Sequence, residues 1–327
     1  MISILNKLIP AETNLPWLAK VTMLLILVLL PFILSSYGLS LLTKVLIFGL
    51  FAMSLDILVG FTGLVSFNHA SFFGVAAYTV GILVNRGFEN FWLLLIPGIA
   101  IALLLAGLLG LLILRSSGAY FLMITLAFGQ MLFALAWKWR SLTGGDDDGL
   151  PGIGRPEIGL PISMWNEQNF YFLVLILFIG SFLLIKKVIK SPFGKSIVGT
   201  RENELRMQSL GYNTWLIKYI SYIIAAGFAA LAGILYTYFN GFISPQELDW
   251  SMSGYILLMV IIGGAGTLVG PVVGAAVIII LQNLISTYTE LWPLFMGLIF
   301  ILCVLFARDG IVGSLLKLYQ KKVGEMK

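Results

Sequence analysis

The stretch FWLLLIPGIAIALLLAGLLGLLIL, which runs from Phe91 to Leu114, carries no charged residue. A helix rises 1.5 Å per residue, so about 20 mostly apolar residues are enough to cross the hydrocarbon core of a bilayer. The core of a soluble domain does not require an uncharged stretch of this length. Phe91–Leu114 is therefore predicted to be a transmembrane helix.

Comparable apolar stretches recur along the whole chain, which is 59% hydrophobic and only 11% charged. They lie near Val21–Ser36, Ser40–Val59, Ser66–Val84, Ala119–Trp137, Asn169–Ile185, Thr214–Tyr238, Ser253–Gly263, Pro271–Ser286 and Leu291–Phe306. Together with Phe91–Leu114 they predict an all-α polytopic membrane protein with about ten transmembrane helices.

The distribution of Lys and Arg predicts the orientation of these helices. If the N-terminus lies inside, ten spans place the C-terminus inside as well, and 14 of the 20 Lys and Arg then fall inside. Cytoplasmic loops carry such an excess, so we expect both termini in the cytoplasm. The net charge of +5 then reflects topology rather than nucleic-acid binding. Fusing Ser253–Gly263 with Pro271–Ser286 would put the basic C-terminus outside, so these two segments are predicted to be separate.

Few residues suggest catalysis or a bound cofactor. The single cysteine, Cys303, excludes disulfide frameworks, and the single histidine, His69, has no second His or Cys nearby with which to hold a metal. Gly194-Lys195-Ser196 resembles the end of a phosphate-binding loop, but Ile189 stands where that motif needs its first Gly. We expect no cofactor, no metal site and no ATP binding by this device.

A basic interruption at residues 186–213 carries six Lys or Arg and two Glu between two long apolar spans. Ser191-Pro192-Phe193-Gly194 predicts a turn, and the following residues predict a short helix from Lys195 to Leu210 that Gly211 would end. Such a loop suits a docking surface on the cytoplasmic side. The alternative is an ordinary solvated loop whose charges serve only topology.

On the outside we expect two long loops, and both are net acidic. The first covers residues 138–168 and contains Asp146-Asp147-Asp148; the second, Phe239–Met252, contains Glu247 and Asp249. These loops could receive a soluble partner or the solute. They could equally be solvated turns in which Asp bonds to its own backbone.

Two glycine-rich stretches, Gly60–His69 and Ile262–Pro271, predict non-helical backbone at membrane depth. Such backbone is tolerated where it is buried in protein or lines a water-filled path, although small residues also favour close helix packing. Our candidate path-lining residues are Asp56, Gly63, Ser66, His69, Thr125, Gln130, Gly263, Gly264 and Gly266. A carboxylate within a span, such as Asp56, needs a function or a partner, and the adjacent Gly-rich turn or the cytoplasmic interface could supply the latter. His69 could also be a satisfied polar residue at a helix start.

Five motifs in this chain carry a family resemblance. They are Gly60–Gly74, Gly118-Ala119-Tyr120-Phe121 through Gly129-Gln130, Thr143-Gly144-Gly145 with Asp148-Gly149-Leu150, Ser191-Pro192-Phe193-Gly194 through Arg201-Glu202-Asn203-Glu204 to Leu210-Gly211, and Gly263–Gly270. With these motifs the chain resembles the permease subunits of bacterial branched-chain amino-acid ABC importers, of the LivM type.

The resemblance implies one permease domain over residues 1–327 in the bacterial inner membrane. It also implies a second homologous permease subunit, two cytoplasmic ATPase subunits and a periplasmic solute-binding protein as partners. The cytoplasmic loop would be the coupling element. The residues expected to couple it to the ATPases are Arg201, Glu202, Asn203, Glu204, Arg206 and Gly211.

Other functions remain as alternatives at this stage. Related importers move urea or short amides, so the solute is open. An ion-coupled transporter or channel should show more buried carboxylates than Asp56 alone. A membrane enzyme acting on lipids would need clustered carboxylates or His, for which Asp146-Asp147-Asp148 is the single candidate.

Overall fold

The computed structural model describes residues 17–145, 149–159, 161, 163–291, 293–295, 297–299, 301 and 310–314. The membrane-length or apolar helices are α2 (Trp17–Ile33), α3 (Ser36–Asp56), α4 (His69–Asn85), α5 (Phe91–Ile113), α6 (Gly118–Lys138), α8 (Glu167–Lys190), α11 (Thr214–Asn240), α12 (Trp250–Gly263) and α13 (Val269–Tyr288). The short elements are η1 (Ile57–Thr62), α7 (Arg140–Thr143), β1 (Leu150–Pro151), α9 (Pro192–Glu202), α10 (Glu204–Ser209), β2 (Phe242–Ile243) and η2 (Pro245–Leu248).

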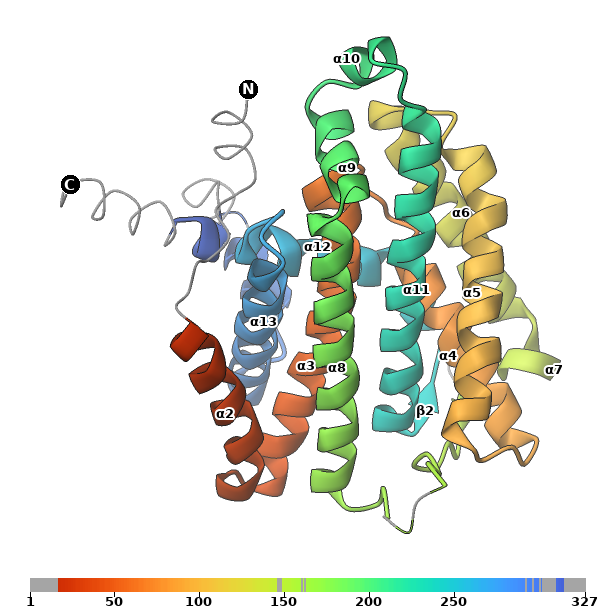
Figure 1. Ribbon diagram of the computed structural model, residues 1–327. Coiled ribbons are helices and arrows are strands. Elements are labelled where there is room, and N and C mark those ends of the chain that lie inside the picture. The colour runs from red at the N-terminus through yellow and green to blue at the C-terminus, as the bar shows by residue number, and fades with distance from the viewer. Residues whose placement is uncertain are drawn as a thin grey trace.

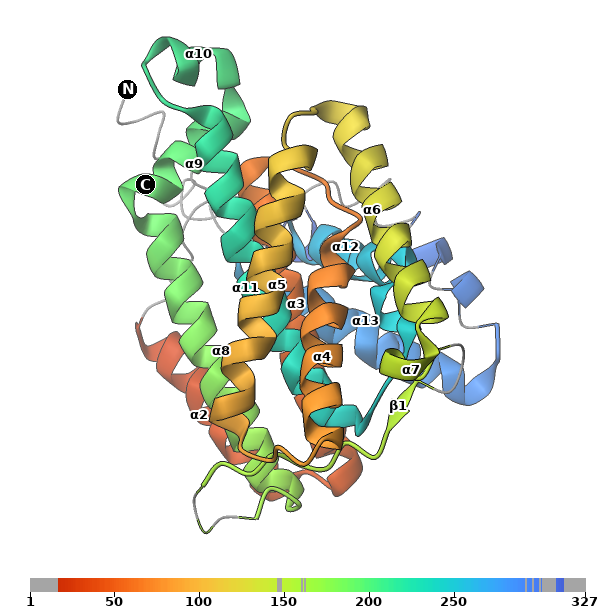
Figure 2. The same cartoon turned by 90° about the vertical axis from the view of Figure 1, so that its right-hand side faces the viewer.

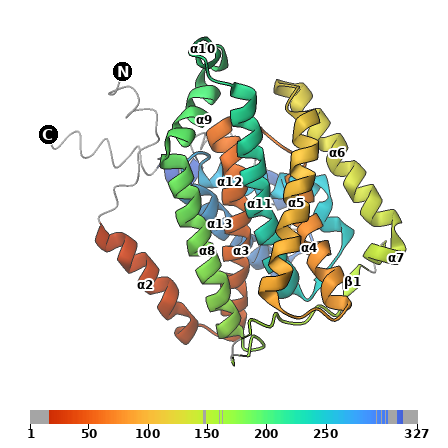
Figure 3. The ribbon, with the colours of Figure 1, turned by 45° about the vertical axis from the view of Figure 1, so that its right-hand side comes forward.

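Helix α3 forms the centre of the helical bundle. Together with η1 it makes a continuous apolar segment, Ser36–Thr62, whose most apolar part is 94% buried inside the chain itself. Helices α8, α11, α12 and α13 pack around it, and α4 and α5 pack against α11 (Figure 1 and Figure 3). The helices around α3 keep much of their apolar surface exposed, as expected of helices that face lipid or another subunit.

The two ends of the bundle differ in character. At one end, α9 and α10 project beyond α8 and α11; at the other, β1, β2 and α7 lie among the loops (Figure 1 and Figure 2). The strands pair antiparallel, with Leu150 opposite Ile243 and Pro151 opposite Phe242. This small ladder, which no pattern in the sequence predicts, connects the expected external loop 138–168 to the chain that follows α11.

Six helices are long and apolar enough to cross a membrane, and α4 and α12 are shorter apolar helices among the described residues. The expected spans Ser66–Val84 and Ser253–Gly263 correspond to these two shorter helices. Half of the expected span Leu291–Phe306 lies outside the described residues. The total of about ten spans and the cytoplasmic position of both termini therefore stay predictions.

The segments on either side of the second glycine-rich stretch form two separate helices, as predicted. A Cβ atom on Gly263 would lie 1.8 Å from the carbonyl oxygen of Gly270, and one on Gly274 would lie 1.9 Å from that of Met259. These pairings show that α12 and α13 run antiparallel with their backbones in contact. Only glycine permits such an approach.

The predicted single helix Lys195–Leu210 is wrong in its bounds and its continuity. Helix α9 begins earlier, at Pro192, because Ser191 caps it and accepts a hydrogen bond from the Gly194 N–H. It stops at Glu202, because Asn203 adopts an extended backbone and its side chain caps α10 by accepting from the Arg206 N–H at 2.9 Å. Gly211, with φ of 86°, follows α10 in the left-handed conformation that its predicted terminating role requires.

Candidate functional site

Three segments that are distant in sequence meet near the base of α9. They are the first glycine-rich stretch, which begins within η1, the turn between α12 and α13, and the last turn of α9 itself. The loop of residues 186–213 and both glycine-rich stretches therefore belong to one structural junction. Asp56 and Arg201 make the contacts that hold this junction together.

Asp56 is fully buried and binds the backbone of the second glycine-rich stretch. Its Oδ1 accepts a hydrogen bond from the Gly266 N–H at 2.7 Å, and its Oδ2 accepts one from the Leu268 N–H at 3.3 Å. Leu268 has φ of 58°, a conformation that a residue with a side chain rarely adopts. The hydrogen-bond partner of this carboxylate is thus the backbone turn at Gly266 and Leu268, more than 200 residues away, and not the nearby Gly60–Gly63 turn.

Arg201 connects α9 to both glycine-rich stretches. Its guanidinium donates a hydrogen bond to the Gly60 carbonyl oxygen. A Cβ on Gly63 would lie 3.0 Å from the Arg201 Cγ, and one on Gly266 would lie 3.7 Å from its Nη1. A Cβ on Gly60 would lie only 2.0 Å from the Asp56 Oδ1, so the close contacts of this junction require glycine at that position.

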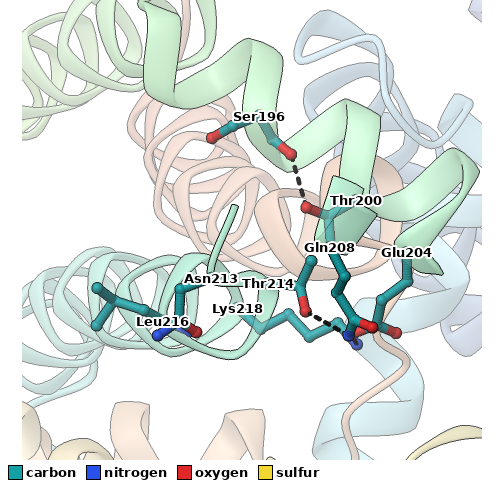
Figure 4. Close-up of polar contacts among 8 residues, drawn as sticks. All are labelled: Ser196, Thr200, Glu204, Gln208, Asn213, Thr214, Leu216 and Lys218. Carbon is teal, nitrogen blue, oxygen red and sulfur yellow. Dashed lines mark hydrogen bonds and ion pairs between the residues drawn. The ribbon is translucent and has the colours of Figure 1, made fainter. Parts of the chain in front are cut away.

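Further polar contacts attach α10 to the first turns of α11 (Figure 4). Glu204 and Lys218 form an ion pair with 2.6 Å between Oε1 and Nζ. Gln208 donates to the Thr214 hydroxyl at 3.0 Å. Lys218, which lies in the predicted span Thr214–Tyr238, therefore has a specific partner, Glu204, in the loop of residues 186–213.

The outer surface of this loop exposes apolar side chains. Leu205, Leu210 and Tyr212 are 75%, 66% and 51% exposed. Glu202 and Arg206 are also exposed, and the break at Asn203 places them on different helices although they are only four residues apart. The loop thus presents an apolar surface with charges around it at the extreme end of the molecule (Figure 1).

Several expected path-lining residues are buried within the chain. His69 is the first residue of α4; its Nε2 lies 2.8 Å from the Ser54 hydroxyl, and its ring stacks on Phe51. Ser66 accepts a hydrogen bond from the Asn68 N–H, and the Thr125 hydroxyl accepts one from the Phe67 N–H. Ser66, His69 and Thr125 hold the chain between η1 and α4 in place.

Gln130 is only half-buried and contacts a residue that the sequence analysis assigned to an external loop. Its Nε2 donates to the Asp249 Oδ1 at 2.8 Å. Glu247, from the same expected loop, is buried and accepts hydrogen bonds from the Ser244 N–H and hydroxyl. The segment after β2 thus returns into the bundle. A capping-box pattern, Ser244 with Glu247, was the signal that could have predicted its ordered structure.

Arg155 stabilises part of the loop at the strand end, which is the end of the bundle that carries β1 and β2. Its guanidinium donates to the Tyr238 carbonyl oxygen at 3.1 Å and lies 4.2 Å from the centroid of the Phe170 ring. Burial lowers the pKa of Arg155, and the Glu167 carboxylate acts in the opposite direction. Asp146-Asp147-Asp148, the candidate for lipid chemistry, lies outside the described residues. Within the described part of the chain, no three His, Cys, Asp or Glu gather as a metal site.

Comparisons with known proteins agree on one family. The profile described as "Branched-chain amino acid transport system / permease component" matches residues 37–304. The high-affinity branched-chain amino acid transport system permease protein LivM of Salmonella typhimurium is 27% identical over 93% of this chain and 77% of its own length. LivM of Escherichia coli K12 is 27% identical over 89% of this chain and 74% of its own length.

A second type of relative also matches. The permease protein LivH of Escherichia coli K12 is 25% identical over 81% of this chain and 91% of its own length. The comparison with solved structures found no match.

Proposed function

The chain belongs to the family of permease components of branched-chain amino acid transport systems, and from this premise we propose how it works as a transport subunit. It forms half of the translocation path of an ATP-driven ABC importer in the bacterial inner membrane. It is a transport protein rather than an enzyme, and partner subunits supply ATP hydrolysis. Branched-chain amino acids are the proposed solutes, since the LivM and LivH relatives are described by that transport.

The observation that best supports a coupled mechanism is the junction around Arg201. Helix α9 belongs to the loop that projects from one end of the bundle, and its Arg201 bonds directly to Gly60 in η1. Gly60 lies against the α12–α13 turn, which Asp56 fixes to α3. A push on α9 would therefore reach two interrupted spans at once. Rigid elements joined by short contacts can transmit such a displacement.

We assign the remaining loop residues by their position. Glu202, Arg206 and the exposed Leu205, Leu210 and Tyr212 provide the surface for a cytoplasmic ATPase. Asn203, Glu204 and Gly211 shape that surface through the cap, the ion pair with Lys218 and the left-handed turn. On this assignment the α10 end lies in the cytoplasm, and we propose the same side for both termini.

The proposed complex contains four other subunits. These are a second, homologous permease, two ATPases and a periplasmic binding protein that delivers the solute to the strand end. The similarity to both LivM and LivH favours a pairing of two related permeases. Gln130 and Gly63 are accessible at the surface of this chain, and we propose that they line the path between the two permeases. The buried candidates Ser66, His69 and Thr125 have a structural role behind that surface.

Purification of the tagged chain in mild detergent, followed by mass spectrometry, tests the assembly. We expect a second permease and two ATPases to be recovered, and ATP-dependent uptake of leucine, isoleucine or valine once the complex and its binding protein are in liposomes. Recovery of the chain alone, under conditions that preserve another membrane complex, would contradict the assembly. Uptake of urea or a short amide instead would contradict the solute.

A further inference from the structure

Asp249 lies at membrane depth. Its partner Gln130 is about 18 Å along α6 from Gly118, and α6 continues for about 12 Å beyond it, at 1.5 Å per residue. Figure 2 shows α6 at the edge of the bundle, with α4 and α12 beside it. The Asp249 carboxylate is therefore held well within the thickness that α6 spans.

The hydrogen bonds that this carboxylate accepts come from uncharged groups. Asp249 accepts hydrogen bonds from the Gln130 amide at 2.8 Å, from the Ser251 N–H at 3.2 Å and from the Ser251 hydroxyl. No Lys, Arg or His of the described residues is paired with it. Its side chain is only half-buried. A partly accessible carboxylate at this depth is costly unless water or a cationic group contacts it.

An acceptor without a partner among the described residues lies near the same part of α6. The Asn68 Oδ1 is fully buried and accepts no hydrogen bond from the described residues. It lies 3.7 Å from the position that a Cβ would take on Gly129, the residue before Gln130 in α6. Asp249 and Asn68 thus lie near two consecutive residues of α6, Gln130 and Gly129. An ammonium group, which only donates, can bond to an acceptor such as the partly accessible Asp249 carboxylate.

Apolar aromatic surface adjoins the carboxylate. Trp250, the next residue, is 48% exposed, and its ring lies 6.3 Å from that of the half-buried Phe67, centroid to centroid. A free amino acid with an apolar side chain combines an ammonium group with an aliphatic surface. Because Trp250 directly follows Asp249 in the chain, an exposed aromatic side chain and a partly accessible carboxylate occur together here, and both suit such a molecule.

We propose that Asp249, held by Gln130, accepts the α-ammonium group of the amino acid in transit, while Trp250 and Phe67 contact its aliphatic side chain. The inference rests on the proposed function, because it takes an amino acid as the solute. A neutral solute such as urea would gain nothing from the Asp249 charge. The site is a contact along the path and supplements selection by the binding protein.

Asp249→Asn tests the charge with little change in structure. Asp249 is the N-cap of α12, and Asn is an equally good cap and can still accept from Gln130. The experiment uses liposomes that contain the whole complex and its loaded binding protein, and we expect the variant complex to assemble as the wild type does. The maximal leucine uptake rate should fall at least about tenfold, and Asp249→Glu should restore part of it.

Two further variants keep the experiment decisive. Asp249→Ser retains a capping oxygen without charge and should show the same loss, so either variant suffices if the other fails to assemble. Glu290→Gln removes an exposed acid beyond α13 and should transport normally. Uptake at the wild-type rate in an assembled Asp249→Asn or Asp249→Ser complex would overturn the proposal. A wild-type complex that moves no amino acid would instead contradict the proposed function.

Discussion

At the scale of single residues, Asp56 and Arg201 share a mode of contact. Each uses a side chain to bind backbone atoms of a segment that is distant in sequence. Backbone groups in a non-helical turn at membrane depth need partners, because the hydrocarbon offers none. The two side chains thus stabilise the turns and also join them.

Removal of the Asp56 carboxylate should weaken the fold. Asp56→Asn leaves one acceptor oxygen for two backbone N–H donors, and a buried donor without a partner costs about 1–3 kcal/mol. We expect a lower unfolding temperature in detergent. Ser71→Ala is the control, because the Ser71 hydroxyl is buried without a hydrogen-bond partner among the described residues. An Asp56→Asn protein as stable as the control would show that these bonds contribute little.

Arg201 should matter for transport more than for stability. Its side chain lies at an exposed position, so Arg201→Ala should assemble, yet ATP hydrolysis should drive less uptake because α9 loses its bond to the Gly60 carbonyl. Arg201→Lys keeps the charge but not the planar guanidinium, and should recover only part of the coupling. The measurement is leucine taken up per ATP hydrolysed.

Arg86→Ala, at the end of α4, provides the matched control because it removes an exposed arginine away from the junction. If Arg201→Ala couples as well as Arg86→Ala, α9 does not act through this contact.

At the scale of helices, the contact between α12 and α13 depends on glycine. Gly274→Ala would place a Cβ 1.9 Å from the Met259 carbonyl oxygen, so the two helices must move apart. Overpacking of this kind costs about 1–3 kcal/mol or more. The unfolding temperature should fall, and Tyr255 and Gln282, which bond across the same pair, should lose their contact.

Gly180→Ala is the matched control for this prediction. Gly180 lies in α8 with nothing within 4 Å of its Cβ position, and alanine favours a helix more than glycine does. This variant should be as stable as the wild type or slightly more stable. Equal stability of Gly274→Ala and Gly180→Ala would show that the α12–α13 contact tolerates a side chain.

The helices themselves could be predicted from the sequence far better than their interruptions. Long apolar runs such as Phe91–Ile113 depend on composition alone, so their positions are clear. The break at Asn203 depends on one cap that competes with good helix formers on both sides, and local propensity favoured the uninterrupted helix. Glycine-rich stretches indicated where the backbone leaves the helix.

The sequence indicates several residues of the candidate site, but it does not indicate the contacts between them. Asp56 and Arg201 were both candidates, but each had been assigned to a separate role. Their meeting is a tertiary contact between residues with no shared local pattern. Asp249 was assigned to an external loop because its neighbours resemble a solvated turn, and its return to α6 depends on packing that no short sequence window records.

At the scale of the whole molecule, the two ends should lie on opposite sides of the membrane. In a Cys303→Ala background, Ser209→Cys on α10 should react with an impermeant maleimide only when the cytoplasmic face is accessible. Ser163→Cys, in the exposed loop before α8, should react from the external face. Labelling of both positions from one side would contradict the proposed orientation.

The junction depends largely on main-chain groups, and this determines which amino-acid substitutions it can accept during evolution. Every residue except proline carries the same N–H, and every residue carries the same C=O, so substitutions at Gly266 or Leu268 cannot remove the atoms that Asp56 binds, unless proline is introduced. What a substitution can change is the room and the backbone angles available. Chains of divergent sequence can therefore keep this junction even where few of the residues around it are identical.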